Sequence, residues 1–152
     1  MRNRQRKCES PGEIGEILKG HKVVAVVGLS PNPERDSYRV ARFLMEQGYE
    51  VIPVNPNYAA VLGKKTYPRL LDIPREMRVE VVDIFRRAEA VPQIVDEAVQ
   101  VGAKVVWMQE GIVHNGAAEK ARAAGLKVVM DRCMMREYRT QMLRQGPRLA
   151  TA

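Results

Sequence analysis

The sequence predicts a three-layer α/β domain of the Rossmann-like type, in which a doubly wound parallel sheet carries helices on both faces. One observation is a pattern that recurs four times, in which a glycine and two further residues precede a pair of β-branched residues. Another is that amphipathic helical patterns separate these pairs. The chain has 152 residues, of which 45% are hydrophobic, and this is enough for one core in one domain.

Five strands are expected from these patterns. The recurring pattern starts at Gly20, Gly48, Gly102 and Gly125. Each glycine suits the left-handed backbone that ends a helix, and each apolar run suits a strand buried on both faces. A fifth run, Val79–Ile84, lacks the glycine but has the same character. Right-handed crossovers leave few topologies, and we expect the strand order 3-2-1-4-5.

Helices are expected between the strands. The second helix has Asp36 or Ser37 as its cap, and the third has Pro92 in its first turn, where proline is tolerated. The expected helices cover about residues 11–19, 36–46, 91–101 and 116–124. Residues 55–78 contain four residues that break regular structure and should form mainly loop with one helical turn. We therefore predict a basic tail at 1–10, one domain at 11–138 and a second tail at 139–152.

The formal net charge of +7 is confined to the two ends of the chain, because residues 8–130 hold equal numbers of cationic and acidic residues. Tails of this kind are usually solvated, so nucleic acid is not an expected partner. No apolar run is long enough to span a membrane. With no secretory signal, Cys8 and Cys133 are expected to be reduced thiols in a cytoplasmic protein. A homodimer or an unidentified protein partner stays open.

A ligand is expected where the winding of the sheet reverses, at the carboxyl ends of strands 1 and 4. There the segment Gly28–Ser37 should meet Gln109, Glu110 and Gly111. The helix after strand 1 offers unpaired N–H groups to an anion, and Ser30, Asn32 and Ser37 can add donors. The turn is neither G-x-G-x-x-G nor a P-loop, so an ordinary strand-to-helix turn is the alternative.

The ends of strands 2 and 3 narrow the choice of ligand. Val51–Asn57 has no acidic residue to hold ribose hydroxyls, which argues against NAD. NADP has only indirect support, from Lys64 and Lys65. After strand 3, Phe85 can cover an adenine or a pantetheine, and Arg86 can pair with a phosphate. Alternatively, Phe85 caps the core and Arg86 is solvated.

Five ordered segments resemble one family. They are Val26–Ser30, Gly48–Pro56, Val82–Arg86, Val106–Ile112 and Met130–Met134. Together they resemble the stand-alone CoA-binding domains, which are related to the N-terminal domain of the succinyl-CoA synthetase α subunit. The resemblance implies coenzyme A or an acyl-CoA as the ligand. The residues expected to bind it are Gly28, Leu29, Ser30, Pro31, Asn32, Ser37, Arg39, Asn55, Pro56, Phe85, Arg86, Met108, Gln109, Glu110 and Gly111. Pro31 and Pro33 replace the glycine-rich turn of the synthetase, and its CoA-contacting lysine has no counterpart near Asn57.

An independent catalytic activity is not expected. The chain lacks a counterpart of the synthetase domain that carries the phosphorylated histidine. A Cys133–His114–Glu110 arrangement is conceivable, but His114 fits better as a helix cap and Cys133 as a small core residue. The spacing of histidines and cysteines predicts no metal site. The sequence therefore predicts a CoA-binding or regulatory module. The alternatives are a protein that binds NADP or another nucleotide, and an enzyme or redox regulator that acts on CoA thioesters through Cys133.

Overall fold

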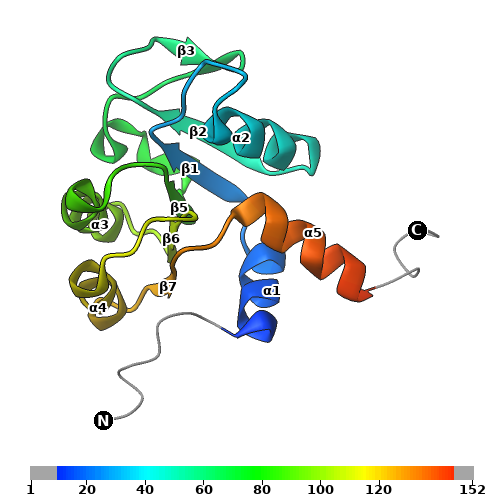
Figure 1. Cartoon of the computed structure of the whole chain (residues 1–152). Helices are drawn as coiled ribbons and strands as arrows, with labels where there is room; N and C mark the ends of the chain where they lie inside the picture. The colour runs from blue at the N-terminus through cyan, green and yellow to red at the C-terminus, as the bar shows by residue number, and fades with distance from the viewer. Residues whose placement is uncertain (1–9, 146–152) are drawn as a thin grey trace.

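A computed structural model describes residues 10–145 (Figure 1). Helices and strands alternate along these residues, as the sequence predicts. The helices are α1 (Pro11–Gly20), α2 (Asp36–Glu46), α3 (Val91–Gln100), α4 (Asn115–Ala123) and α5 (Met134–Gln145). The strands are β1 (Val23–Val27), β2 (Glu50–Val54), β3 (Ala60–Val61), β4 (Lys64–Lys65), β5 (Val81–Ile84), β6 (Val105–Met108) and β7 (Lys127–Val129). Three short 3-10 turns, η2 (Leu70–Asp72), η3 (Arg75–Met77) and η4 (Ala88–Ala90), lie in the connections.

Five of the strands form one parallel sheet in the order β2-β1-β5-β6-β7. The predicted α/β class and the five parallel strands are confirmed. The predicted order 3-2-1-4-5 is wrong, because the third main strand, β5, pairs with β1 and not with β2. Counted by the main strands, the order is 2-1-3-4-5. The point where the winding reverses therefore lies between β1 and β5, and not between the first and fourth strands.

Pro53 gives the physical reason for this order. Proline has no N–H group to donate to a neighbouring strand, so it is tolerated in edge strands. Pro53 lies in β2, pairs in register with Val26 of β1, and accepts a hydrogen bond from Tyr67 N on its outer side at 3.0 Å. The order 3-2-1-4-5 would have made β2 an inner strand. At the edge, β2 is flanked by the segment around Tyr67 instead of a further strand.

The sheet separates two hydrophobic cores (Figure 1). One core lies under α3 and α4 and takes residues such as Ile84, Val106 and Met108. The other lies under α1, α2 and α5 and takes residues such as Val26, Leu44 and Trp107. Residues alternate between the two cores along each strand, as the pleat requires. The side chain of Trp107 is fully buried in the second of these cores.

One connection differs from the sequence prediction. Residues 55–78 are not only loop, since β3 and β4 form a short antiparallel hairpin. Its turn has Leu62 and Gly63 at positive φ. A leucine rarely adopts this conformation, so the sequence of the turn does not predict the hairpin. Near the other end of the described residues, α5 runs from Met134 to Gln145. This helix packs against both α1 and α2.

Candidate functional site

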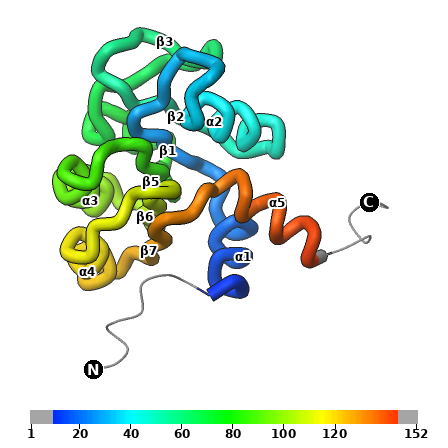
Figure 2. Tube along the Cα trace, viewed as in Figure 1, coloured from blue at the N-terminus to red at the C-terminus, as the bar shows by residue number. Residues whose placement is uncertain are grey.

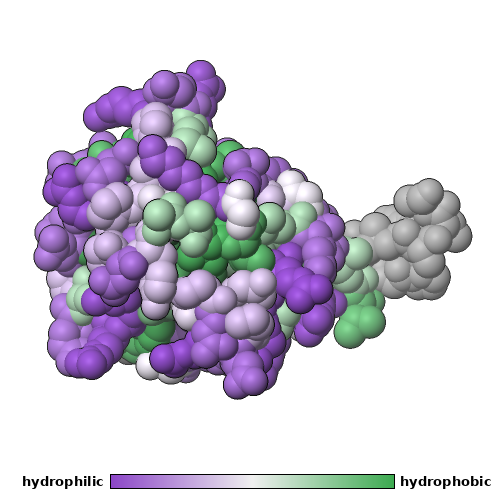
Figure 3. Space-filling view, turned by 90° about the horizontal axis from the view of Figure 1, so that it is seen from above, coloured by the Kyte–Doolittle hydropathy of each residue, from purple (hydrophilic) through white to green (hydrophobic). Residues whose placement is uncertain are grey.

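An open cleft of about 620 Å³ lies at the carboxyl ends of the strands. Five segments that are distant in the sequence meet there, namely those after β1, β2, β5, β6 and β7 (Figure 2). Seen from above, the molecule is hollowed near its centre, with hydrophobic atoms in the hollow and mostly hydrophilic residues around it (Figure 3). The cleft lies at the place where a parallel α/β sheet is expected to bind ligands.

Most of the residues predicted from the sequence line this cleft. On the side of β1, α2 and β2 they are Gly28, Ser30, Ser37, Arg39 and Asn55. On the side of β5 and β6 they are Phe85, Arg86, Gln109 and Glu110. The remaining predicted residues do not line it. Leu29 and Met108 are fully buried in the cores. Pro56 lines a smaller neighbouring depression. Pro31, Asn32 and Gly111 are exposed outside the cleft.

Gly28 sits where β1 and β5 meet below the cleft. Its φ is +89°, and a Cβ atom built on it would lie 2.6 Å from the carbonyl oxygen of Phe85. Any other residue would therefore clash with backbone and adopt a disfavoured φ. The glycine allows the turn after β1 to lie directly beside the Phe85–Arg86 segment. This close approach depends on the observed strand order.

The turn after β1 satisfies most of its own N–H groups. Ser30 N donates to Ser37 Oγ at 3.0 Å, and Asn32 N donates to Ser30 Oγ at 3.0 Å. Glu34 N donates to Asn32 Oδ1 at 2.9 Å, and Arg35 N donates to the Asn32 carbonyl oxygen at 3.0 Å. The side chains that the sequence offers as donors to a phosphate thus act as acceptors that shape the turn. The turn is consequently a rigid frame, and its backbone amides are largely occupied.

Helix α2 begins at the edge of the cleft. Its N-cap is Arg35, whose side chain makes no capping hydrogen bond, so the expected cap at Asp36 or Ser37 is off by one or two residues. Asp36 forms an ion pair with Arg39 at 2.8 Å, and both side chains are exposed. The first N–H groups of a helix have no intrahelical partner, so this end attracts negative charge. The carboxylate of Asp36 opposes that attraction locally.

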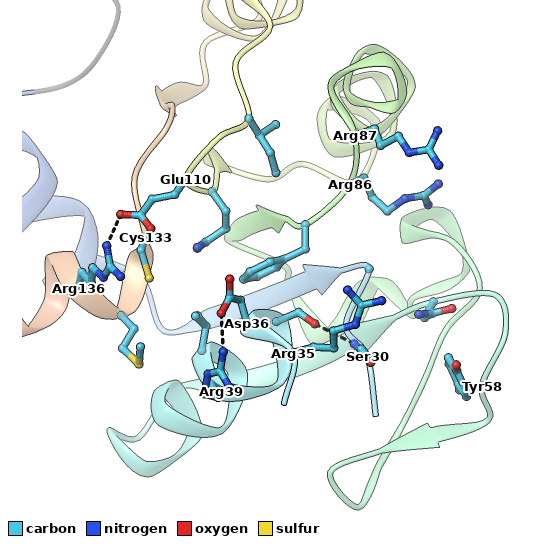
Figure 4. Close-up of a pocket in the computed structure, with 18 of the residues that line it drawn as sticks. Ser30, Arg35, Asp36, Arg39, Tyr58, Arg86, Arg87, Glu110, Cys133 and Arg136 are labelled. Atoms are coloured by element: carbon cyan, nitrogen blue, oxygen red, sulfur yellow. Dashed lines mark hydrogen bonds and ion pairs between the residues drawn. The ribbon is translucent and has the colours of Figure 1, made fainter. Parts of the chain in front are cut away.

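One end of the cleft is cationic. Arg35, Arg86 and Arg87 all line it, and all three are exposed. Within the described residues 10–145, none of these arginines has a carboxylate partner, whereas Arg39 and Arg136 do. In Figure 4, Arg86 and Arg87 project side by side, and Arg35 and Tyr58 lie on the same side of the cleft. The arrangement can bind an anion with several charged oxygens, because guanidinium groups pair well with phosphates.

The opposite end of the cleft is built from the segments after β6 and β7. Cys133 and Met135 line it together with Gln109 and Ile112. Figure 4 shows Cys133 across the cleft from Arg86 and Arg87, beside the ion pair of Glu110 and Arg136, whose side-chain atoms lie 2.7 Å apart. Apart from that internally neutral pair, this end carries thiol, thioether, amide and alkyl groups. The cleft is therefore polarised from a cationic end to an uncharged end.

Phe85 lies between these ends and serves both roles considered for it. Its side chain is half-buried and packs against the core under α1, α2 and α5. It also lines the cleft, where an aromatic face is open to a ligand. Directly below in the sheet, Asp83 is fully buried, and neither carboxylate oxygen has a partner among the described residues. Burial raises the pKa of Asp83 well above its usual range.

Several cleft residues are absent from the sequence prediction. Arg35 immediately precedes α2 and Arg87 follows Arg86, so their positions beside predicted residues could have identified them. Asn57 and Tyr58 follow the predicted Asn55–Pro56 pair. Met135 and Arg136 could not be found in this way, because they reach the cleft only through the packing of α5 against α2.

The residues considered for catalysis do not form a triad. The prediction that His114 caps a helix is confirmed, because His114 is the N-cap of α4 and its Nδ1 accepts from Ala117 N at 3.0 Å. His114 does not line the cleft. Within residues 10–145, no three His, Cys, Asp or Glu residues lie close enough to hold a metal ion. No helix in the same part of the chain is long and apolar enough to cross a membrane. Cys8 lies outside the described residues.

Comparison with known families gives one match that covers most of the chain. A family model described as "CoA binding domain" matches residues 22–139. This range contains all the strands and every residue that lines the cleft. It also contains the five segments on which the resemblance seen in the sequence rests.

Three individual proteins show the range of relatives. The uncharacterized protein YneT of Bacillus subtilis is 39% identical over 125 residues, which are 82% of this chain and 91% of that protein. A hypothetical protein from Pyrococcus horikoshii has a solved structure that matches with a TM-score of 0.83 at 47% identity, over 87% of this chain and 92% of that one. The α subunit of acetate–CoA ligase (ADP-forming) I from Pyrococcus furiosus is 37% identical over 130 residues, which are 75% of this chain and 28% of that subunit.

Proposed function

The chain belongs to the family of CoA-binding domains, and on that premise we propose that its cleft binds coenzyme A or an acyl-CoA. The proposed role is that of a binding or regulatory module without catalysis of its own. The observation that carries the proposal is the polarity of the cleft, with Arg35, Arg86 and Arg87 at one end and uncharged groups at the other.

The cationic end fits the phosphates of CoA. The molecule has a diphosphate and a 3′-phosphate on its nucleotide half, and an uncharged pantetheine arm on the other half. Three arginines without carboxylate partners in the described residues supply donors for several phosphate oxygens. An arrangement that binds one phosphate would need fewer cations. The number and spread of the guanidinium groups thus favour a ligand with more than one phosphate.

The middle and the far end of the cleft fit the rest of the molecule. Phe85 offers an aromatic face for the adenine or the pantetheine arm. Gln109 is 4% exposed, and its Oε1 accepts from Met134 N at 3.1 Å. Its Nε2 group has no partner in the described part of the chain. This group is a donor for an amide or thioester carbonyl oxygen of the pantetheine arm.

NADP or another nucleotide is the alternative ligand, because unpaired arginines also suit a 2′-phosphate. Thermal unfolding in the presence of millimolar ligand separates the two. We expect CoA to raise Tm in a concentration-dependent way, since a ligand that binds only the folded state stabilises it. We expect NADP and ATP to raise Tm less. A clear shift with NADP and none with CoA would contradict the proposal.

The arginine end can be tested with a matched pair of variants. Arg86→Ala should weaken CoA binding about tenfold or more, because a hydrogen bond to a charged group contributes about 1.5–3 kcal/mol. Arg42→Ala is the control, since Arg42 lies on α2, pairs with Glu46 and does not line the cleft. Isothermal titration calorimetry measures both affinities. Equal CoA affinities for the two variants would show that the phosphates of CoA do not bind to Arg86.

A further inference from the structure

We propose that Cys133 is a thiol-exchange site that forms a mixed disulfide with CoA bound in the cleft. This inference rests on the proposed function, because it requires the nucleotide half of CoA at the arginine end. It adds a covalent capture of the oxidised ligand, CoA disulfide, to reversible binding of CoA. The geometry of the cleft wall, the spare amide of Gln109 and the place of Cys133 in the fold support it.

Cys133 stands at the end of the cleft where the CoA thiol should lie. It lines the cleft and is 7% exposed, so its thiol faces the ligand space and little else. Arg86 and Arg87 lie across the cleft from it (Figure 4). If the phosphates pair with these arginines, the pantetheine arm extends along Phe85 towards Cys133. The sulfur of the ligand and the sulfur of the protein then approach one another.

The segment that carries Cys133 is held firmly to the end of β6. Trp107 Nε1 donates to the Arg132 carbonyl oxygen at 2.8 Å, and Met134 N donates to Gln109 Oε1 at 3.1 Å. Gly111 N donates to Asp131 Oδ1 at 2.7 Å. These bonds flank Cys133 on both sides along the chain. The segment that carries the thiol is therefore fixed on the cleft wall.

Gln109 provides an independent indication that a ligand belongs at this end. Its side chain is nearly buried and lines the cleft, yet its Nε2 group has no partner in residues 10–145. The Nε2 group opens onto the cleft and is available there as a hydrogen-bond donor. A carbonyl oxygen of the pantetheine arm would satisfy it. Because Gln109 also binds Met134 N, this carbonyl would lie next to Cys133.

The position of Cys133 at the start of α5 suits the exchange reaction. Glu137 N donates to the Cys133 carbonyl oxygen at 2.9 Å, which places Cys133 at the N-terminal cap of a helix of 12 residues. The attacking species in thiol–disulfide exchange is a thiolate. Negative charge is stabilised at a helix N-terminus by the unpaired N–H groups. Arg136 adds a cation in the first turn of the helix, although it is paired with Glu110.

The reaction balances without a further reagent. The Cys133 thiol loses its proton, and the thiolate attacks one sulfur of CoA disulfide. The S–S bond of the ligand breaks, and a new S–S bond joins Cys133 to one CoA. The second CoA leaves as a thiolate and takes up the proton. The Cys133 sulfur is oxidised from a thiol to a disulfide, and the sulfur of the released CoA is reduced from a disulfide to a thiol.

The test is intact-mass spectrometry of the purified protein after incubation with CoA disulfide. A Cys8→Ser variant keeps Cys133 as the only cysteine. We expect it to gain one CoA in mass, to lose that gain on reduction, and to react at least about tenfold faster than with glutathione disulfide, because binding holds the reacting atoms together. Cys133→Ser should show no gain at the site. Arg86→Ala should slow the reaction in proportion to its loss of CoA affinity.

Three other results would overturn the inference. One is an equal rate of disulfide formation with CoA disulfide and with glutathione disulfide, which would mean that Cys133 reacts without prior binding of CoA. A second is S-acetylation of Cys133 by acetyl-CoA without any disulfide adduct, which would assign acyl transfer instead. The third is the absence of an adduct. A thermal shift of the wild-type protein with reduced CoA under reducing conditions then shows whether the proposed function survives or fails with it.

Discussion

The two faces of the central sheet bury different kinds of groups. Under α3 and α4, the strands contribute only apolar side chains, such as Ile84 and Val106. Under α1, α2 and α5, the same strands bury Asp83 between Val26 and Trp107, and β6 leads directly into Gln109. Cys133 belongs to this second core as well. The strands thus bury a charged side chain only on the second face, beneath the cleft, although helix α3 buries Glu97 on the first.

Of the substitutions that test this difference between the two faces, the largest loss of stability is expected on the face under α3 and α4. Ile84→Ala removes a fully buried side chain from the core under α3 and α4. The free energy of unfolding should fall by about 3 kcal/mol, because the lost burial and the remaining cavity add up. Urea unfolding followed by circular dichroism measures the loss. Leu143→Ala is the control, since Leu143 is 81% exposed and should change stability by less than about 0.5 kcal/mol.

Substitution of the neighbouring residue, Asp83, should raise the stability of the protein, whereas Ile84→Ala lowers it. Burial raises the pKa of Asp83, so as the pH rises above about 4 the unfolded chain releases this proton before the folded protein does. Stability therefore falls as the pH rises from about 4 towards the raised pKa. Asp83→Asn removes this dependence and should be more stable than the wild type at pH 7, because the amide has no charged form to be buried.

Thermal unfolding of the wild type and of Asp83→Asn at a series of pH values tests whether the gain in stability comes from the carboxyl of Asp83. The advantage of Asp83→Asn should vanish below about pH 3, where the carboxyl is protonated in both the folded and the unfolded state. Asp96→Asn is the matched control, because Asp96 is exposed and pairs with Lys120. It should show no gain at pH 7. An Asp83→Asn variant that is less stable than the wild type at pH 7 would show that the carboxyl has a partner and that the two faces differ less than described.

A smaller effect is expected at the hydrogen bond between Asp131 and Gly111, beside the cleft. Asp131 has a φ of +60°, and its Oδ1 accepts from Gly111 N. Asp131→Ala loses this hydrogen bond and keeps an unfavourable φ, so stability should fall by about 1 kcal/mol. Asp131→Asn retains an acceptor and tolerates the left-handed region, and it should stay close to the wild type. Thermal unfolding of both variants measures the difference. Equal losses would mean that the hydrogen bond between Asp131 and Gly111 does not stabilise the protein.

Local patterns were sufficient for the elements of the main sheet and its helices. The glycines before three of the strands have positive φ, as predicted for helix ends at Gly48, Gly102 and Gly125. Gly20 is different, because it remains within α1. The β3–β4 hairpin was not predictable, since its turn places Leu62 at positive φ against its own preference. There, pairing between Ala60 and Lys65 decides the conformation.

The residues of the candidate site were predictable where they directly follow a strand. They were not predictable where tertiary packing brings them to the cleft. Gly28, Phe85, Arg86 and Gln109 follow strands, and parallel strands bring their carboxyl ends to one edge. The donors expected in the turn after β1 are mostly used within the turn, which only the hydrogen-bond geometry shows. Whether the predicted residues bind CoA stays a prediction.

The sequence by itself determined the kind of fold and the segments that surround the cleft, because periodicity, helix-ending glycines and strand ends are local properties. The tertiary structure decided which strands are neighbours. A buried apolar strand fits equally well at several places in a parallel sheet, so the choice depends on contacts between distant residues. Here β5 inserts beside β1, and β2 with Pro53 stays at the edge. That choice places Arg86 beside Gly28, and the packing of α5 then brings Cys133 to the opposite wall.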